Sequence, residues 1–380
     1  MTSLTNHLPA PEFINEQPVF EELMQRLQNE KIMAIDSEAN SLFAYQEQVC
    51  LIQISTGSAD YIIDPLPLVD LASLGQIFKN PNIEKVFHAS EYDILIMYDD
   101  FKFEFRNLFD TMLAAQILGR EKLGLDTLME NIVGIKVNKK YQRADWGKRP
   151  LSDDMLHYAQ MDTHHLIKIR QVLAAELEEQ GLTSIASEDF KLACQVHRQP
   201  KEENISSCWR INGARKLSPQ KAAVLARLCE YREDVAKKRN VPVFKVLSAK
   251  TLLLLAEESP TSINQLLNLN IPGGKAIQRH AEGLMSAVQA GMESKPELPP
   301  RRERLGDSYL AREKALRDWR KIKARKMNVN SAVVLPREIM YNLISHNPKT
   351  KAELASVLKN VPWRLDKFGD EILSVLTQTN

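Results

Sequence analysis

Two acidic residues, Asp36 and Glu38, stand in an otherwise apolar run that reads IMAIDSEA from Ile32 to Ala39. In a β-strand, residues two apart point to the same face, so both carboxylates would face one side of a sheet. Two partly buried carboxylates repel each other, and a cation or a shared proton is needed to hold them together. The pair therefore indicates a divalent-metal site or, as the alternative, two solvated acids at the end of a strand.

Three further side chains are suited to the same chemistry. Asp93 lies near the start of a predicted helix, and Tyr158 and Asp162 are four residues apart on another. This spacing puts the phenol and the carboxylate on one helix face, about a turn apart. Taken singly, each is an ordinary surface or capping residue. Combined with Asp36 and Glu38, they would form an all-oxygen site, which suits Mg²⁺ or Mn²⁺ rather than zinc.

The first half of the chain predicts a fold that would position these residues. Short β-rich runs predict four strands, the first three in a meander: Ile32–Ala39, Val49–Ser55, Tyr61–Asp64 and Lys85–His88. Helical periodicity then predicts helices at Glu91–Asp99, Thr111–Leu118, Leu125–Ile132 and, as one long element, Asp153–Glu179. Helices packed on such a sheet make an α/β domain.

The second half of the chain is predicted to be helical. Ser218 is a candidate N-cap before Pro219 at the first helical position. The further predicted helices are Ser248–Glu258, Ser262–Leu267, Gly274–Ala290, Asp307–Lys326, Pro336–His346, Lys351–Val357 and Trp363–Thr377. The proline-rich stretch Glu293–Arg302 separates two similar sets, which suggests an imperfect duplication of a module of roughly 80 residues. We therefore expect three domains, at 1–205, 206–295 and 296–380.

The formal net charge of +1 hides a strong asymmetry. Residues 1–205 carry 19 basic and 32 acidic side chains, whereas residues 206–380 carry 31 and 17. An acidic half suits cation binding, and a basic half suits a polyanion such as nucleic acid. The segment Arg301–Lys326, in which Tyr309 and Trp319 are interleaved with Lys and Arg, is the strongest candidate for phosphate contacts. The alternative is that the two halves attract each other.

Cysteine content and hydropathy limit the cellular context. Four cysteines, Cys50, Cys194, Cys208 and Cys229, are too widely spaced for paired zinc-binding motifs, and we expect all four to be reduced. The longest apolar runs are far shorter than the roughly 20 residues of a membrane span. We therefore expect a cytoplasmic protein with no membrane association and no obligate protein partner.

The combined motifs resemble the DEDD superfamily of 3′-5′ exonucleases, Tyr subclass. The stretch Ala144–Leu166 (ADWGKRPLSDDMLHYAQMDTHHL) is similar to the last motif of the ribonuclease D family, and Lys85–Leu95 (KVFHASEYDIL) is similar to its second motif. Residues 206–295 resemble an HRDC domain, and residues 303–380 look like a more diverged copy. The resemblance implies an α/β ribonuclease H-like exonuclease domain with a mixed sheet flanked by helices, followed by two all-α HRDC-type bundles.

The resemblance also implies a role for each acid. Asp36 would bridge two divalent ions, Glu38 and Asp162 would complete the site that holds the nucleophilic water, and Asp93 would serve the second ion. Tyr158 would orient the nucleophile by a hydrogen bond, because a phenol is a poor base at neutral pH. The supporting positions His88, Asp110 and Gln53, and the packing histidines His164 and His165, are not expected to be ligands.

A histidine offers an alternative to the tyrosine. His157 lies five residues before Asp162, which is the spacing of the His subclass of the same superfamily. At about 100° per residue, Tyr158 would point some 40° from Asp162, and His157 about 140° away. Helix geometry therefore favours Tyr158.

Three functions are compatible with these patterns. The first is a 3′-5′ exoribonuclease that trims structured RNA such as tRNA precursors, a substrate class that comes from the resemblance. The second is a DNA 3′-5′ exonuclease, because no reader of the 2′-hydroxyl can be identified in the sequence. The third is a non-catalytic RNA-binding protein on a degenerate nuclease fold, which the presence of all four acids and the tyrosine disfavours.

Overall fold

The computed structural model describes residues 8–195, 207–296 and 305–379. They form two compact units: one comprises the described parts of 1–39, 49–197 and 305–380, and the other comprises 40–48 with the described part of 198–304. Among the described segments, no helix has both the length and the apolar character that a membrane span requires. The predicted boundary between residues 205 and 206 lies outside the described residues, and the division into three domains stays a prediction.

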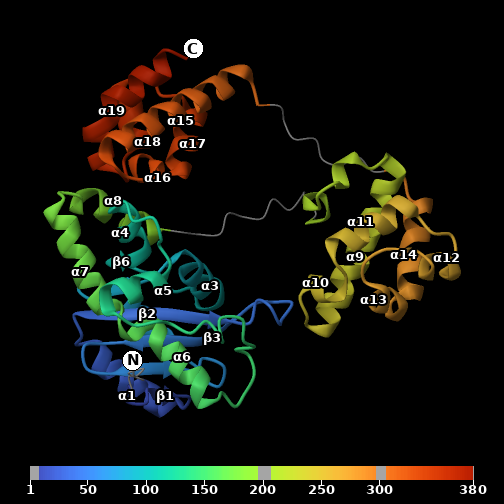
Figure 1. Ribbon diagram of the computed structural model, residues 1–380, viewed down its shortest axis with the longest axis horizontal. Helices are drawn as coiled ribbons and strands as arrows, with labels where there is room; N and C mark the ends of the chain where they lie inside the picture. The colour runs from blue at the N-terminus through green and yellow to red at the C-terminus, as the bar shows by residue number, and fades with distance from the viewer. Residues whose placement is uncertain (1–7, 196–206, 297–304, 380) are drawn as a thin grey trace. The chain divides into compact units, whose positions relative to one another are not determined.

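A six-stranded mixed sheet forms the centre of the first unit, in the order β1-β4-β3-β2-β5-β6 (Figure 1). The strands are β1 (Glu12–Ile14), β2 (Ile32–Ala39), β3 (Val49–Ser55), β4 (Asp60–Ile63), β5 (Glu84–Phe87) and β6 (Leu108–Asp110). Strands β2, β3 and β4 form the predicted antiparallel meander, and β1, β5 and β6 join parallel neighbours. The sequence pattern does not predict the edge strands β1 and β6, because three residues are too few to show a period.

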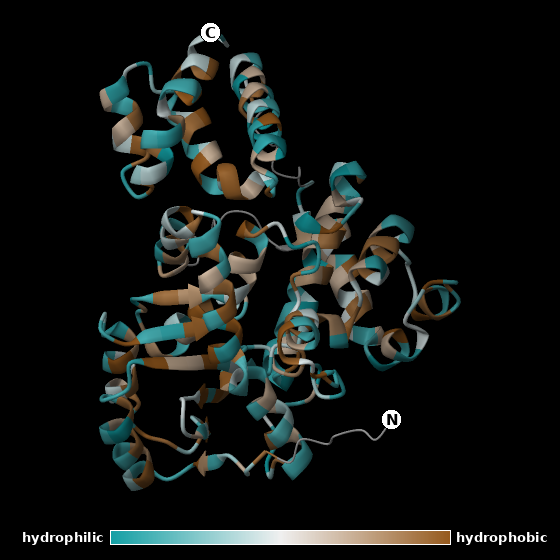
Figure 2. Ribbon diagram, turned by 60° about the vertical axis from the view of Figure 1, so that its left-hand side comes forward, coloured by the Kyte–Doolittle hydropathy of each residue, from teal (hydrophilic) through white to brown (hydrophobic). Residues whose placement is uncertain are grey.

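Helices surround this sheet and complete the predicted α/β fold. They are α1 (Gln17–Leu27), α2 (Ala72–Lys79), α3 (Glu91–Phe101), α4 (Thr111–Ile117), α5 (Leu125–Leu128), the π-helix η1 (Met129–Val133), α6 (Asp153–His164), α7 (Leu166–Glu179) and α8 (Thr183–Ala193). The strands are predominantly brown in Figure 2, and Met33, Ile35 and Val86 are fully buried among them.

Two of the helices predicted for this unit differ from the structure. The predicted element Asp153–Glu179 is divided at His165, where the backbone departs from regular helix with ψ of −4°. As a result α6 packs on β2, β3 and β4, whereas α7 packs on β2 and β5. The predicted helix Leu125–Ile132 passes into the π-helix η1 after one α-helical turn. Apolar periodicity predicts helical character but not these interruptions.

The second unit is a helical bundle. Its elements are the 3₁₀ turns η2 (Ser207–Arg210) and η3 (Ala214–Lys216), and the helices α9 (Pro219–Arg239), α10 (Val243–Val246), α11 (Ala249–Glu258), α12 (Ile263–Leu267), α13 (Gly274–Arg279) and α14 (Ala281–Glu293). The predicted helix Gly274–Ala290 is interrupted at His280.

The cysteine prediction was wrong for two of the four residues. Cys208 and Cys229 form a disulfide, with their Cα atoms 6.0 Å apart, whereas Cys50 and Cys194 are not disulfide-bonded. The turn η2 brings Cys208 back against α9, a long-range contact that spacing along the chain does not reveal.

A second helical bundle belongs to the same unit as the sheet. It contains α15 (Asp307–Met327), α16 (Ser331–Val334), α17 (Arg337–His346), α18 (Lys351–Val357) and α19 (Pro362–Thr377). The pairs α9 and α15, α10 and α16, and α11 and α17 have equal lengths of 21, 4 and 10 residues, as expected for a duplication. The two copies differ at the next helix. In the first copy, α13 begins with exposed Gly274 and Lys275, whereas in the second copy the corresponding helix, α19, buries Arg364. Val333 of α16 is part of the core around the sheet.

Candidate active site

Strand β2 presents the two acids of the first motif. Asp36 pairs with Gln53 of β3, Glu38 pairs with Leu51, and the register shifts directly after Glu38 at a β-bulge. Both acids are half-buried, and the intervening Ser37 is buried on the opposite face. The strand therefore holds both carboxylates on one face near its end, as the spacing of two predicts.

Helix α6 brings Tyr158 and Asp162 over that face. The helix starts at the N-cap Ser152, whose hydroxyl accepts a hydrogen bond from the Met155 N–H. The preceding loop is fixed by Arg149, whose guanidinium contacts the Asp64 carboxylate at 2.5 and 2.8 Å and donates to the Cys50 carbonyl. This anchor ties the start of α6 to β3 and β4.

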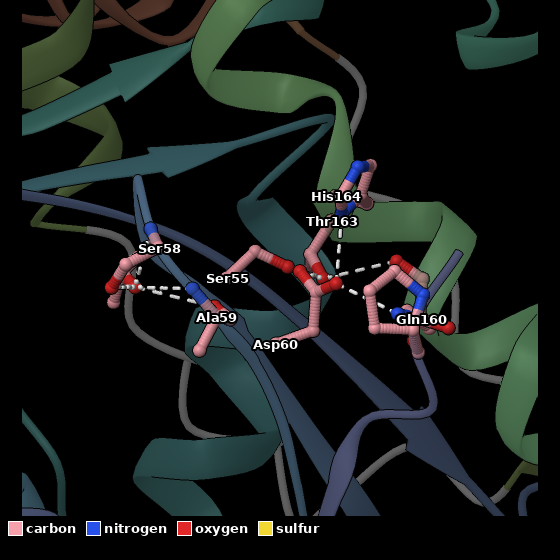
Figure 3. A network of polar contacts seen from close by, with 9 residues as sticks. Ser55, Ser58, Ala59, Asp60, Gln160, Thr163 and His164 are labelled. Atoms are coloured by element: carbon pink, nitrogen blue, oxygen red, sulfur yellow. Dashed lines mark hydrogen bonds and ion pairs between the residues drawn. The ribbon is translucent and has the colours of Figure 1, made fainter.

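A polar network joins the C-terminal end of α6 to the sheet (Figure 3). The Asp60 carboxylate accepts a hydrogen bond of 2.7 Å from Gln160 Nε2 and lies 2.7 Å from His164 Nδ1. The Ser55 and Thr163 hydroxyls are also 2.7 Å apart. His164 thus packs against an acid of β4, in agreement with its predicted packing role, and the network fixes the helix on either side of Asp162.

Asp93 is positioned through a third strand. The Asp110 carboxylate at the end of β6 accepts hydrogen bonds from the Ala89 and Ser90 backbone N–H groups at 3.1 and 2.8 Å, and it also caps α4. These bonds support Ala89 in a left-handed conformation, with φ of 62°, directly before α3. Asp93 in the first turn of α3 then accepts a hydrogen bond from the Ser37 hydroxyl.

Three of the predicted ligands meet in one cluster. Carboxylate oxygens of Asp36, Glu38 and Asp162 all lie within 4.8 Å of one another. Asp93 is not part of this group and is held by Ser37, although its charge acts on Asp162. The structure therefore brings three of the four acids together and places the fourth nearby, as expected if Asp93 serves a second ion.

Burial and mutual repulsion dominate the electrostatics of the cluster. Burial first, and neighbouring carboxylates second, raise the pKa values of Asp36, Glu38 and Asp93 well above their ordinary range. Burial, with a contribution from Asp93, raises the pKa of Asp162 to about 7. Such a group of acids favours either protonation or a bound cation.

A divalent cation fits these residues. The available donors are carboxylate oxygens, which are the ligands that Mg²⁺ and Mn²⁺ prefer, and the three acids are close enough to share one ion. A bound cation would also offset the repulsion that raises their pKa values.

Tyr158, rather than His157, adjoins the carboxylates. Burial raises the pKa of the Tyr158 phenol above its ordinary value, and the charges of Asp162, Glu38 and Asp36 raise it further. The phenol therefore stays protonated at neutral pH and is available as a hydrogen-bond donor. His157 is exposed on the helix.

We expect Tyr158→Phe to lower the rate of hydrolysis by about 100-fold, because a positioned proton donor or acceptor contributes at least that much. His157→Ala should keep a rate close to that of the wild type. Single-turnover kinetics on a short RNA would measure both, and near-ultraviolet circular dichroism would check that the ring at position 158 still packs near Trp146 in the variant. Loss of activity in His157→Ala with activity retained in Tyr158→Phe would reverse the assignment.

The sequence analysis missed several residues that support the site. Ser37 lies between the two acids of the first motif, and its type alone does not show that it holds Asp93. Asp60 and Asp64 lie at the two ends of β4 and fix α6 and its loop, far along the sequence. The charge complementarity of Arg149 and Asp64 is visible in the sequence, but their proximity depends on the sheet.

Comparison with protein families agrees with the predicted motifs. A model described as "3'-5' exonuclease" matches residues 11–178, and the HRDC domain matches twice, at residues 221–288 and 310–376. The double match agrees with the duplication inferred from helix lengths.

Individual proteins resemble the chain over most of its length. Ribonuclease D from Gluconacetobacter diazotrophicus is 30% identical over 286 residues, which covers 74% of this chain and 72% of that protein. Protein RRP6-like 2 from Arabidopsis thaliana is 32% identical over 293 residues. The chain spans only 34% and 47% of the RRP6-like 2 and RRP6-like 1 proteins, respectively.

Solved structures show the same fold. The catalytic core of RRP6 from Trypanosoma brucei is 28% identical, with a TM-score of 0.67, and the match covers 77% of this chain and 83% of that one. Escherichia coli RNase D is 23% identical, with a TM-score of 0.69, and the match covers 97% of this chain and 99% of that one.

Proposed function

The chain belongs to the ribonuclease D family, and we propose on that basis that it is a metal-dependent exoribonuclease that removes nucleotides one at a time from the 3′ end of RNA. The observation that carries this proposal is the cluster of Asp36, Glu38 and Asp162, whose carboxylate oxygens lie within 4.8 Å of one another. The alternatives are a DNA 3′-5′ exonuclease and a non-catalytic RNA-binding protein.

Each residue of the cluster has a separate role in this proposal. Asp36, Glu38 and Asp162 would hold a divalent ion, Mg²⁺ or Mn²⁺, and Asp93 would serve a second one. Such ions would supply a nucleophile at neutral pH and stabilise charge on the scissile phosphate. Tyr158 remains protonated and orients the attacking water by donating or accepting a hydrogen bond. The network around Asp60 keeps α6, and with it Tyr158 and Asp162, in place.

We further propose that the substrates are structured RNAs with a 3′ tail, such as tRNA precursors, bound without an obligate protein partner. The name "Ribonuclease D" of the relative from G. diazotrophicus supports an RNA substrate, and the name "Exosome complex exonuclease RRP6" of the relative from Saccharomyces cerevisiae supports exonuclease activity. The RRP6 match covers only 40% of that protein, so its place in a larger complex is not carried over.

The basic helix α15 is the proposed RNA-binding surface. Trp319 is only partly exposed: its indole donates a hydrogen bond of 2.9 Å to Glu371, and its ring packs edge-on against Phe368. The interpretation of Trp319 as a packing residue is therefore favoured. Lys321 and Arg325 are exposed on the same helix and are available to phosphates. Residues 301–304 of the predicted basic segment lie outside the described residues.

We expect the double variant Lys321→Glu/Arg325→Glu to weaken binding of folded RNA and to flatten its salt dependence, because about one counterion is released per phosphate contact. Hydrolysis of a dinucleotide should be unchanged, because its one phosphodiester bond must lie at the carboxylate cluster to be cleaved and leaves none for α15. Fluorescence anisotropy at several salt concentrations would measure binding. Unchanged affinity for folded RNA would exclude α15 as the RNA-binding surface.

Metal removal tests the function as a whole. EDTA should abolish release of 3′ nucleotides from a short single-stranded RNA, and Mg²⁺ or Mn²⁺ should restore it, because the carboxylates cannot act without cations. The release of mononucleotides from matched RNA and DNA oligomers, followed by chromatography, would separate the ribonuclease from the DNA exonuclease. Activity that persists in EDTA would exclude the mechanism, and RNA binding without cleavage at any metal concentration would favour the non-catalytic alternative.

A further inference from the structure

A buried glutamine lies directly beside the proposed metal site. Gln53 is fully buried on β3 and pairs with Asp36 of β2 on one side and with Ile62 of β4 on the other. Residues directly opposite on neighbouring strands point to the same face, with Cβ atoms about 4.5–5.5 Å apart. The Gln53 amide therefore lies on the face that carries the catalytic carboxylates, in the layer covered by α6.

The amide of this residue has no partner. Neither Nε2 nor Oε1 of Gln53 makes a hydrogen bond to any residue that the structure describes. Burying an amide without hydrogen bonds destabilises a fold, and buried polar groups are therefore almost always paired. An apolar side chain of the same size would suit the metal-free protein better.

The surroundings of Gln53 indicate where its partner lies. Ile62 offers no polar atom, and the hydroxyl of Ser55, two residues further along β3, is engaged with Thr163. Asp36, on the neighbouring central strand, carries a carboxylate, which has four lone-pair sites and accepts more than one hydrogen bond. A carboxylate that binds a cation through one oxygen keeps the other available to a donor.

We propose that Gln53 is a positioning residue of the metal site: when a divalent cation is bound, its Nε2 donates a hydrogen bond to the Asp36 carboxylate and holds that carboxylate in its ligating orientation. The inference rests on the proposed function, since it requires Asp36 to be a ligand. Groups behind a ligand commonly fix its orientation in this way. The unpaired amide then destabilises the metal-free fold, and this destabilisation is removed when the cation binds and the amide gains its hydrogen bond.

The substitution Gln53→Met separates stability from metal binding, because Met has a similar length and no amide. The metal-free variant should melt about 2–4 °C above the metal-free wild type, since an unsatisfied buried group is removed. Its affinity for Mn²⁺ alone, measured by titration calorimetry at constant pH, should fall by roughly 10–100-fold. Leu51→Met on the same face of β3 is the matched control and should leave Mn²⁺ affinity close to that of the wild type.

The possible outcomes are distinct. A Gln53→Met protein that binds Mn²⁺ as tightly as the wild type, or that melts below it without metal, overturns the inference. A wild-type protein that does not bind Mn²⁺ at all overturns the proposed function itself. If Gln53→Met does not fold, a crystal structure of the wild type with Mn²⁺ decides: a hydrogen bond from Gln53 Nε2 to Asp36 supports the inference, and an amide that is still unpaired overturns it.

Discussion

Asp36→Asn is expected to reduce hydrolysis by about three orders of magnitude or more, which corresponds to several kcal/mol of lost stabilisation of the transition state. Asp36 belongs to the carboxylate cluster, with an oxygen within 4.8 Å of oxygens of both Glu38 and Asp162. The amide of Asn has nearly the same shape but no charge, so it is a weaker ligand for a hard cation. Rapid-quench measurement of nucleotide release under single-turnover conditions would show the loss.

Two controls separate lost chemistry from lost structure. RNA affinity, measured in EDTA, should match that of the wild type, because the phosphate contacts proposed for α15 are unaffected. The metal-free Asp36→Asn protein should melt at or above the wild-type temperature, because burial and repulsion from Asp162 already penalise the charged form of Asp36. Residual hydrolysis above about one per cent would count against Asp36 as a ligand.

Arg364→Met is expected to lower the free energy of unfolding by about 3–5 kcal/mol, the usual cost of leaving a buried charge without its partner. Arg364 is fully buried, and its guanidinium contacts Glu188 at 3.0 Å and Asp189 at 2.7 Å on α8. It also donates to the carbonyls of Val333 and Val334. Burial raises the pKa of Asp189 to about 6 even though Arg364 is beside it. Removal of the arginine should therefore destabilise the fold strongly. Urea unfolding followed by circular dichroism would measure the change.

An exposed ion pair in the same bundle provides the matched control. Lys351 and Asp370 lie 2.7 Å apart, but their side chains are 79% and 81% exposed, so Lys351→Met should cost less than about 1 kcal/mol. Adding Glu188→Gln and Asp189→Asn to Arg364→Met should recover part of the loss, since it removes the unpaired charges. If Arg364→Met lowered the free energy of unfolding no more than Lys351→Met does, the contact between α19 and α8 would not stabilise the unit that contains the sheet.

The parts of the site that depend on local spacing could be predicted from the sequence. A separation of two on a strand and of four on a helix fixes which side chains share a face, so Asp36 and Glu38 share one face of β2 and Tyr158 and Asp162 share one face of α6. The meeting of the two pairs depends on the packing of α6 on β2. Strands β2 and β3 were predicted at their observed bounds for the same reason.

The parts that depend on long-range contacts could not be predicted. The position of Asp93 depends on Asp110, which lies on an edge strand too short to show periodicity. The break at His165 coincides with a change in packing, because α6 contacts β2, β3 and β4 whereas α7 contacts β2 and β5. The pairing of Cys208 with Cys229 depends on a turn that folds back on α9. In each case the deciding contact joins different secondary-structure elements, which the periodicity within one element does not show.

The duplicated bundles have lost their equivalence at one helix. Where the first copy exposes Lys275, the second has Trp363 at the start of a helix that buries Arg364 against α8. The second copy is therefore tied into the compact unit that contains the sheet, through Glu188 and Asp189 of α8. Exchanging the two copies would remove the arginine that pairs with these two carboxylates.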